Sequence, residues 1–167
     1  VTACNIKEGT KTIGNAAFLN CWVLTDVYIP ASVTKICNTA FAQCYALESI
    51  VIPNGVKSIG ADAFYYCVKL NSVTIGSGVT SIGDRAFHPC YELESIVISD
   101  SVESIGKEAF YNCSLNSVTI GSGVTHIGAF AFEYNNYDMV MYCYENSAAH
   151  RYALENDIEC VTREGNS

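Results

Sequence analysis

The 167-residue chain is 50% hydrophobic, and its 17 acidic residues outnumber 9 Lys and Arg, which gives a net charge of −8. An acidic chain repels phosphate backbones and anionic lipids, so we expect no nucleic-acid binding and no attachment to a charged membrane. No apolar run approaches the ~18 residues that a membrane span requires, so membrane insertion is not expected either. The length is compatible with a single domain.

A repeat of 23 residues runs through most of the chain, and Ile59–Ser81 is one complete copy. Each copy, here called a coil, carries an Ala-Phe pair and, three residues after the Phe, a cysteine. A coil this short cannot bury its own apolar face, so successive coils must stack on one another. The recurring residues form a phenylalanine column (Phe18, Phe41, Phe64, Phe87, Phe110, Phe132) and a cysteine ladder (Cys21, Cys44, Cys67, Cys90, Cys113).

The residues of one coil predict its local structure. Leu70–Ile75 alternates between apolar and polar residues as a short strand does, with the apolar side chains pointing inward. Gly76 then bends the chain, and Val79–Ile82 offers a second short inward-facing run. Ala63–Cys67 has the spacing of one helical or 3₁₀ turn. The order strand, bend, short strand and helical turn predicts a β-solenoid.

A second, longer sequence repeat is superimposed on the 23-residue repeat. Leu47–Ile52 recurs letter for letter as Leu93–Ile98, and Asn71–Thr80 recurs as Asn116–Thr125. The pattern indicates an ancestral unit of two coils, and we expect it to have no physical consequence.

The sequence after the last coil predicts a cap. Asn146–Asn156 reads as a helix whose apolar face consists of Ala149, Tyr152 and Ala153, spaced at i, i+3 and i+4. Ile158–Val161 alternates like a last strand. Because the open end of a solenoid exposes an apolar cross-section, an amphipathic segment is needed to cover it.

Nine cysteines raise the question of disulfide bonds. Stacked strands lie about 4.8 Å apart, which holds the parallel Cβ atoms of the cysteine ladder beyond the usual ~3.5–4.5 Å of a disulfide. Because the ladder has an odd number of cysteines, its five members also cannot all form disulfides with one another. The ladder is therefore predicted to consist of buried, reduced thiols.

Ile36–Ser58 follows the pattern IGxxAFxxCxxLxxIxIPxxVxx except that Cys37 replaces the glycine. The sequence thereby resembles the BspA-like, or treponemal-type, leucine-rich repeat family from Ile6 to Met141, and YCYENSAAHRYALENDIECV resembles the closing segment of bacterial members. The resemblance implies a right-handed leucine-rich-repeat coil. It also implies a secreted or cell-surface location and an association with adhesion to host or neighbouring cells.

The predicted fold is a mainly β repeat solenoid of 23-residue units with parallel strands, short helical turns and a C-terminal helical cap. One leucine-rich-repeat domain covers residues 1–167. Since Ile6 has the register of Ile29 and Ile52, the chain opens in mid-coil and is expected to be a piece of a longer protein. The divisions are a partial coil at 1–12, about six coils at 13–141, the cap at 142–161 and a frayed tail at 162–167.

Catalytic and metal motifs are weak. His88 and Cys90 form the closest His–Cys pair, but Cys90 belongs to the inward ladder and is not available as a nucleophile. Cys37 and Cys44 lack the spacing of a zinc site, and the three histidines lie far apart in the sequence. We therefore predict that the chain is not an enzyme and holds no metal or cofactor.

Two surfaces are candidate binding sites. The sheet-face column is the row of outward strand positions, and the aromatic stripe is the set of rings that flank the cysteine ladder. The alternative interpretation is that Thr and Val simply suit stacked strands, and that the rings lie flat over apolar surface. The sheet-face column is Tyr28, Val51, Thr74, Val97 and Thr119, extended by Val140, beside Asp26, Ser49, Ser72, Ser95 and Ser117, extended by Asp138. The aromatic stripe is Trp22, Tyr45, Tyr65, Tyr66, Tyr91, Tyr111 and Tyr134.

The predicted function is a non-catalytic binding or adhesion module, monomeric, within a larger secreted or cell-surface protein. Its expected partner is an extended extracellular or host protein or glycan. The alternative is a structural spacer that displays another domain and has no ligand of its own. Rings exposed to solvent would favour binding, so the exposure of the tyrosines discriminates between the two.

Overall fold

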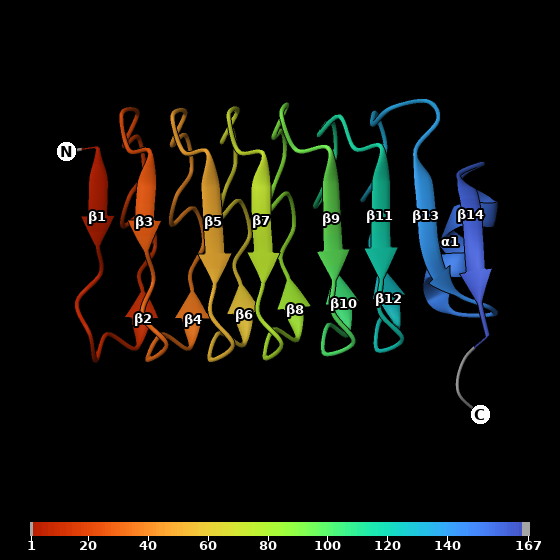
Figure 1. Cartoon of the computed structure of the whole chain (residues 1–167), viewed down its shortest axis with the longest axis horizontal. Helices are drawn as coiled ribbons and strands as arrows, with labels where there is room; N and C mark the ends of the chain where they lie inside the picture. The colour runs from red at the N-terminus through yellow and green to blue at the C-terminus, as the bar shows by residue number, and fades with distance from the viewer. Residues whose placement is uncertain (1, 165–167) are drawn as a thin grey trace.

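The computed structural model describes residues 2–164 and shows a solenoid of stacked coils closed by a helix and a last strand (Figure 1). Long strands stand side by side in one row, and shorter strands form a second row that runs in the opposite direction (Figure 1). Every strand pair is parallel, with partners about one repeat apart along the chain for all but the last pair. The predicted parallel-strand solenoid with a C-terminal helix is confirmed.

The long strands carry the inward–outward alternation that the sequence predicts. In β5, Ile50 and Ile52 are buried while Ser49 and Val51 are exposed. Alternation follows from the two-residue period of a strand, which sends successive side chains to opposite faces. The long strands are β1 (Ala3–Asn5), β3 (Asp26–Tyr28), β5 (Ser49–Ile52), β7 (Ser72–Ile75), β9 (Ser95–Ile98), β11 (Ser117–Ile120), β13 (Val140–Tyr144) and β14 (Glu159–Arg163).

The second row is one continuous six-stranded sheet of two-residue strands. In each strand one residue faces outward and an isoleucine faces the core. The strands are β2 (Thr12–Ile13), β4 (Lys35–Ile36), β6 (Ser58–Ile59), β8 (Ser81–Ile82), β10 (Ser104–Ile105) and β12 (His126–Ile127).

The segment Ala63–Cys67, predicted as a helical turn, consists of β-turns instead. Asp62 and Tyr66 have φ of 55° and 58°, the left-handed conformation that a type II turn requires and a helix excludes. The backbone N–H groups of Asp62, Phe64 and Tyr66 donate to carbonyls of the next coil at 2.8, 2.7 and 3.0 Å. These donors bond between coils rather than within a helical turn, so the turn segment joins each coil to its neighbour.

The phenylalanine column forms the centre of the core. Adjacent rings stack with centroids 4.9–5.3 Å apart and planes within 6° of parallel. Every ring but the first is buried, and Phe18 is half-buried because no earlier coil covers it. The column therefore runs unbroken through the stack and ends at Phe132 against the cap.

The cysteine ladder lies beside this column, and its last four members are buried, as predicted. Each buried thiol donates to a phenylalanine carbonyl of an earlier coil; for Cys113 and Phe87 the Sγ–O distance is 2.9 Å. Burial is the main cause that raises the pKa of the Cys44 thiol to about 12. Cys21 is only half-buried, and all nine cysteines are free thiols in the structure.

Asn135 occupies the ladder position in coil six and takes over the role of the thiol. Its amide nitrogen donates to the carbonyls of Phe110 and Phe132 at 2.9 and 2.8 Å. Its amide oxygen accepts from the backbone N–H groups of Cys113 and Leu115 at 3.1 and 3.0 Å. Coil five is one residue shorter than coil four, because one residue separates Cys113 from Leu115 where two separate Cys90 from Leu93. Four backbone groups around this shorter turn thus depend on one side chain.

We expect Asn135→Ala to lower the free energy of unfolding by about 2–4 kcal/mol, because it leaves half-buried donors and acceptors without partners. Asn135→Cys restores a donor alone and should recover part of the loss. Asn71→Ala is the control, since this exposed amide makes one contact at 3.4 Å. Urea denaturation measures all three variants, and equal losses for Asn135→Ala and Asn71→Ala would contradict the prediction.

The long strands fall into three separate groups. They pair as β1–β3, β5–β7 and β9–β11–β13–β14, with no pairing between β3 and β5 or between β7 and β9. A Cβ on Gly78 would lie 1.9 Å from the Asn54 carbonyl oxygen, across the paired strands β5 and β7. Gly55 holds the same position in coil two, and a Cβ there would lie 2.6 Å from the Ala31 carbonyl oxygen, although β3 and β5 do not pair. Close contacts at this position therefore do not decide which strands pair.

The cap differs in detail from the prediction. Helix α1 (Ala148–Glu155) begins after Ser147, whose hydroxyl accepts from the His150 N–H, and it buries Ala149, Tyr152 and Ala153 as predicted. The Tyr152 ring meets the edge of Phe132 at 5.9 Å between centroids. Thr162 and Arg163, predicted to be a frayed tail, belong to β14 and pair with β13. Residues 165–167 of that predicted tail lie outside the described residues.

Candidate functional site

The sheet-face column lies on the outward side of the long strands. Val51 and Val97 are the most exposed of its apolar members, with 62% and 64% of their surface accessible. Strand register aligns Val51 with Thr74, and Val97 with Thr119, which is half-buried. The structure therefore brings the predicted residues together in register within each pair of strands.

Two shallow hollows interrupt this face where the long strands do not pair. The first has a volume of about 310 Å³ and the second about 360 Å³. One spans the break between β3 and β5, and the other the break between β7 and β9. The sheet-face residues that line the first are Asp26, Tyr28, Ser49 and Val51, and those that line the second are Ser72, Thr74, Ser95 and Val97.

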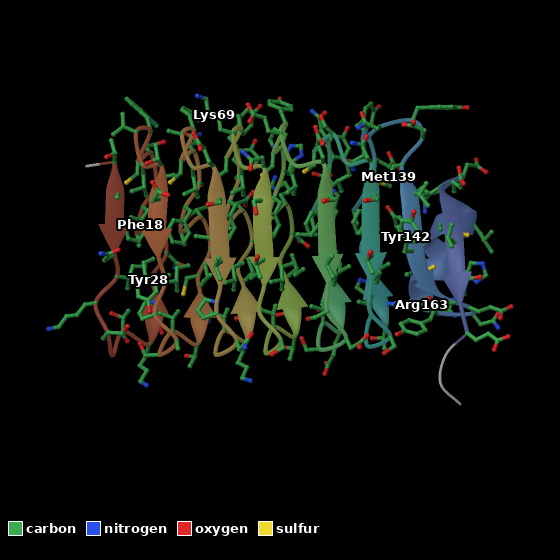
Figure 2. The ribbon with its side chains drawn as sticks, viewed as in Figure 1. Phe18, Tyr28, Lys69, Met139, Tyr142 and Arg163 are labelled. Atoms are coloured by element: carbon green, nitrogen blue, oxygen red, sulfur yellow. The ribbon has the colours of Figure 1, made fainter. Side chains whose placement is uncertain are left out.

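The register between β11 and β13 corrects the predicted continuation of the sheet-face column into coil six. Val140 pairs with Ser117, and Tyr142 pairs with Thr119, so Tyr142 rather than Val140 continues the outer row. Asp138 lies before the strand begins. Tyr142 is exposed and stands toward the C-terminal end of the face, while Tyr28 stands toward the other end (Figure 2). An aromatic side chain therefore lies near each end of the face, which the sequence pattern did not reveal.

Tyr28 also carries a local charge contact. Its hydroxyl donates to the Glu8 carboxylate at 3.2 Å, and the charge of that carboxylate is the main cause that raises the pKa of Tyr28. The contact holds the ring against the first bend of the chain. Tyr28 is thus a positioned ring at the edge of the first hollow.

The aromatic stripe divides into exposed and half-buried rings. Trp22 and Tyr134 are 60% and 72% exposed, and Tyr45, Tyr66 and Tyr91 are exposed as well. Tyr65 and Tyr111 are half-buried and belong to a row of rings that the sequence analysis missed, because His88 stands between them. The row runs Tyr65–His88–Tyr111–Tyr134, with centroids 5.5, 5.0 and 4.9 Å apart. Five of the seven predicted rings are therefore available to a partner.

A third hollow, of about 460 Å³, lies at the end of this row and was not predicted. Two carboxylates and four rings from the turn segments of coils four to six surround it. Phe130 departs from the repeat, because no other coil has an aromatic residue at its position, but the sequence does not show which side chains lie beside it. The lining of the hollow is His88, Glu108, Tyr111, Phe130, Glu133 and Tyr134.

His88 and Cys90 are not arranged as a base and a nucleophile. The Nδ1 atom of His88 donates to the Tyr111 carbonyl at 3.1 Å, whereas Cys90 is buried and its thiol points to the Phe64 carbonyl at 3.7 Å. Burial raises the pKa of the Cys90 thiol, which opposes formation of a thiolate. This pair therefore offers no nucleophile to a substrate.

Within residues 2–164, no group of three or more His, Cys, Asp or Glu side chains could hold a metal ion. Over the same residues, the structure contains no helix long and apolar enough to cross a membrane. The candidate surfaces that remain are the sheet-face column and the exposed rings of the aromatic stripe.

Solved structures support the fold. The T. pallidum leucine-rich repeat protein matches with a TM-score of 0.72 and 22% identity, covering 98% of this chain and 87% of its own. The pneumococcal vaccine antigen PcpA matches with a TM-score of 0.69 and 18% identity, covering 84% of this chain and 44% of its own. A leucine-rich repeat protein from Bacteroides ovatus matches with a TM-score of 0.58 and 20% identity, covering 98% and 66%. No curated protein sequence matches this chain.

The family model for the BspA type leucine rich repeat region matches six copies across residues 10–138. These residues hold the phenylalanine column, the cysteine ladder and most of both candidate surfaces. The chain belongs to the BspA-type leucine-rich repeat family.

Proposed function

We propose that this domain is a non-catalytic binding module of a larger secreted or cell-surface protein, and that it recognises an extended protein or glycan chain through the sheet-face column. Leucine-rich repeat domains are generally protein-binding or structural modules, and their stacked coils offer long exposed surfaces. The observation that carries the proposal is the pair of hollows on the sheet face, lined by exposed valines and by small hydroxyl side chains. A surface-displayed protein would present this face to extracellular partners.

The spacing of the two hollows suits an extended partner. They lie two coils apart, which at ~4.8 Å per coil is about 10 Å along the solenoid axis. A peptide in the polyproline II conformation advances about 9 Å over three residues and presents every third side chain on one side. Such a peptide, lying along the axis, would place one side chain in each hollow. The rim is built from serine and threonine hydroxyls, which both donate and accept hydrogen bonds.

The exposure of the aromatic rings favours a binding module over a spacer. A spacer gains nothing from Trp22 and Tyr134 rings with most of their surface in solvent. Trp and Tyr are enriched in recognition surfaces because each ring offers a large contact area with little entropy loss on ordering. The aromatic stripe is the second candidate surface, adjacent to the sheet face along the same coils.

Lysine substitutions in the second hollow test the sheet-face proposal. Thr74→Lys with Val97→Lys should lower the affinity for a partner at least tenfold, about 1.4 kcal/mol, while the melting temperature stays unchanged because both side chains point to solvent. Partners come from arrays of extracellular-matrix proteins, proline-rich peptides and glycans. Ser77→Lys, at an exposed bend, is the charge-matched control for one substitution.

Two results would count against the proposal. If Thr74→Lys with Val97→Lys leaves the affinity intact while Tyr66→Ala with Tyr91→Ala removes it, the aromatic stripe is the binding surface. If the arrays return no partner at all, the domain is a spacer.

A further inference from the structure

The unpredicted hollow at the end of the ring row is unusual in its backbone. Phe130 and Tyr134 have φ of 60° and 56°, the left-handed conformation that bulky side chains rarely adopt. The first of these positions holds Ala16, Thr39, Asp62, Arg85 and Glu108 in the other coils. Coil six alone places an aromatic side chain at both left-handed positions of its turn segment.

The core does not require these two rings. Phe130 is 46% exposed and Tyr134 is 72% exposed, so neither gains the burial that normally offsets a strained backbone. Asn or Gly would fit both positions better. Strain without burial indicates that the rings serve the surface they form.

The groups that face the hollow are mainly hydrogen-bond acceptors. Glu133 takes part in no salt bridge among residues 2–164, and Glu108 has only the exposed Lys107 ammonium at 3.3 Å. Because the Tyr111 carbonyl can only accept, it takes the Nδ1 hydrogen of His88, which leaves Nε2 as an acceptor in the neutral ring. Only the phenol groups of Tyr111 and Tyr134 can donate. Acceptors therefore outnumber donors around the hollow.

Besides burial, the two carboxylates of the hollow contribute to the raised pKa of Tyr111. Burial is the main cause that raises its pKa, followed by the neighbouring Tyr134 and then by the carboxylates of Glu133 and Glu108. Since the acidic chain carries a net charge of −8, its wider field also attracts cations. A ligand for this hollow should therefore be positive and rich in hydrogen-bond donors.

We propose that this hollow binds the guanidinium group of an arginine side chain in a basic peptide segment of a partner. A guanidinium is planar, carries five N–H donors and no acceptor, and stacks on aromatic faces. Phe130 and Tyr134 supply the faces, and Glu133 accepts the paired N–H groups. The site is separate from the sheet face, and the two proposals can fail independently.

The test uses the whole domain and the peptide acetyl-Gly-Arg-Gly-amide, followed by backbone amide NMR shifts at low salt. Saturable shifts should be confined to the turn segments around the hollow and centred on 130–134. The same peptide with citrulline, which keeps the shape of arginine but not its charge, should bind at least fivefold more weakly. Glu133→Gln should weaken binding of the arginine peptide by a similar factor, whereas Glu48→Gln, an equal charge change four coils away, should not.

Phe130→Asn separates binding from folding. Asparagine tolerates the left-handed backbone, so this variant should keep or raise the melting temperature while losing the peptide. Val97→Lys on the sheet face should leave arginine binding unchanged. A lower melting temperature for Phe130→Asn would show that the ring is structural and would overturn the proposal.

Three other results would also overturn it. The first is the absence of saturable shifts, and the second is an equal loss of affinity in Glu133→Gln and Glu48→Gln, which would show a diffuse charge effect. The third is binding of the neutral sugar maltohexaose at these residues with no binding of the arginine peptide, which would make the hollow a glycan site.

Discussion

Phe64→Ala is expected to lower the free energy of unfolding by about 3–5 kcal/mol, as truncation of a fully buried phenylalanine does. Its ring is inaccessible to solvent and is stacked between Phe41 and Phe87, at 5.2 and 5.1 Å. Removing the ring leaves a cavity between two flat neighbours that the backbone bonds between coils hold in place. Urea denaturation followed by circular dichroism measures the loss.

The two ends of the phenylalanine column provide the controls. Phe18→Ala should lower the free energy of unfolding by less than Phe64→Ala does, since Phe18 is half-buried and has a stacked ring on one side only. At the other end of the column, the structure buries Phe132 between Phe110 and the Tyr152 ring of the cap. Phe132→Ala should therefore cost about as much as Phe64→Ala. A loss for Phe18→Ala equal to that of Phe64→Ala would contradict this picture.

Deleting residues 146–167 is expected to cause aggregation or oligomer formation and to lower the melting temperature sharply. The deletion removes α1 and β14, which exposes Phe132 and Met141 and leaves β13 without its outer partner. An exposed apolar cross-section next to an unpaired strand edge is a template for association. Size-exclusion chromatography with light scattering, together with a thermal melt, measures the outcome.

Point variants keep this prediction testable if the shortened chain cannot be produced. Tyr152→Ala removes the ring on Phe132 and the hydroxyl that accepts the Phe132 N–H at 3.3 Å, and should destabilise the cap by about 3 kcal/mol. Leu154→Ala, on the exposed face of α1, should change little. If the shortened protein is monomeric and its melting temperature is unchanged, the segment does not cover the apolar end of the solenoid.

The sequence specified the repeat and, with it, most of the fold. A 23-residue period with one inward Phe and one inward Cys per coil allows only a stack, because no single coil can bury those side chains. Strand alternation then assigned the core residues and the outward row, and the helical spacing of Ala149, Tyr152 and Ala153 identified the cap. These features depend on which residues are apolar and on how they are spaced, and both can be read from the chain.

Only the tertiary structure decided which groups on different coils contact one another. Ala63–Cys67 has helical spacing, yet its backbone donors bond to the next coil, and no local pattern shows where an N–H group finds its acceptor. Likewise, the sequence does not show that the long strands divide into separate groups, with no pairing between β3 and β5 or between β7 and β9. The strand register also placed Tyr142, one full repeat after Thr119, in the outer row in place of Val140.

The hollow lined by Glu108, Phe130 and Glu133 shows the same limit at a candidate site. These residues belong to two coils, and although Phe130 departs from the repeat, no local pattern shows that the two carboxylates lie beside it. Stacking brings their side chains around one hollow, because residues about one repeat apart in the chain become neighbours across the coil interface. The sequence determined that a surface would repeat along the solenoid, and the contacts between coils decided where that surface is hollowed.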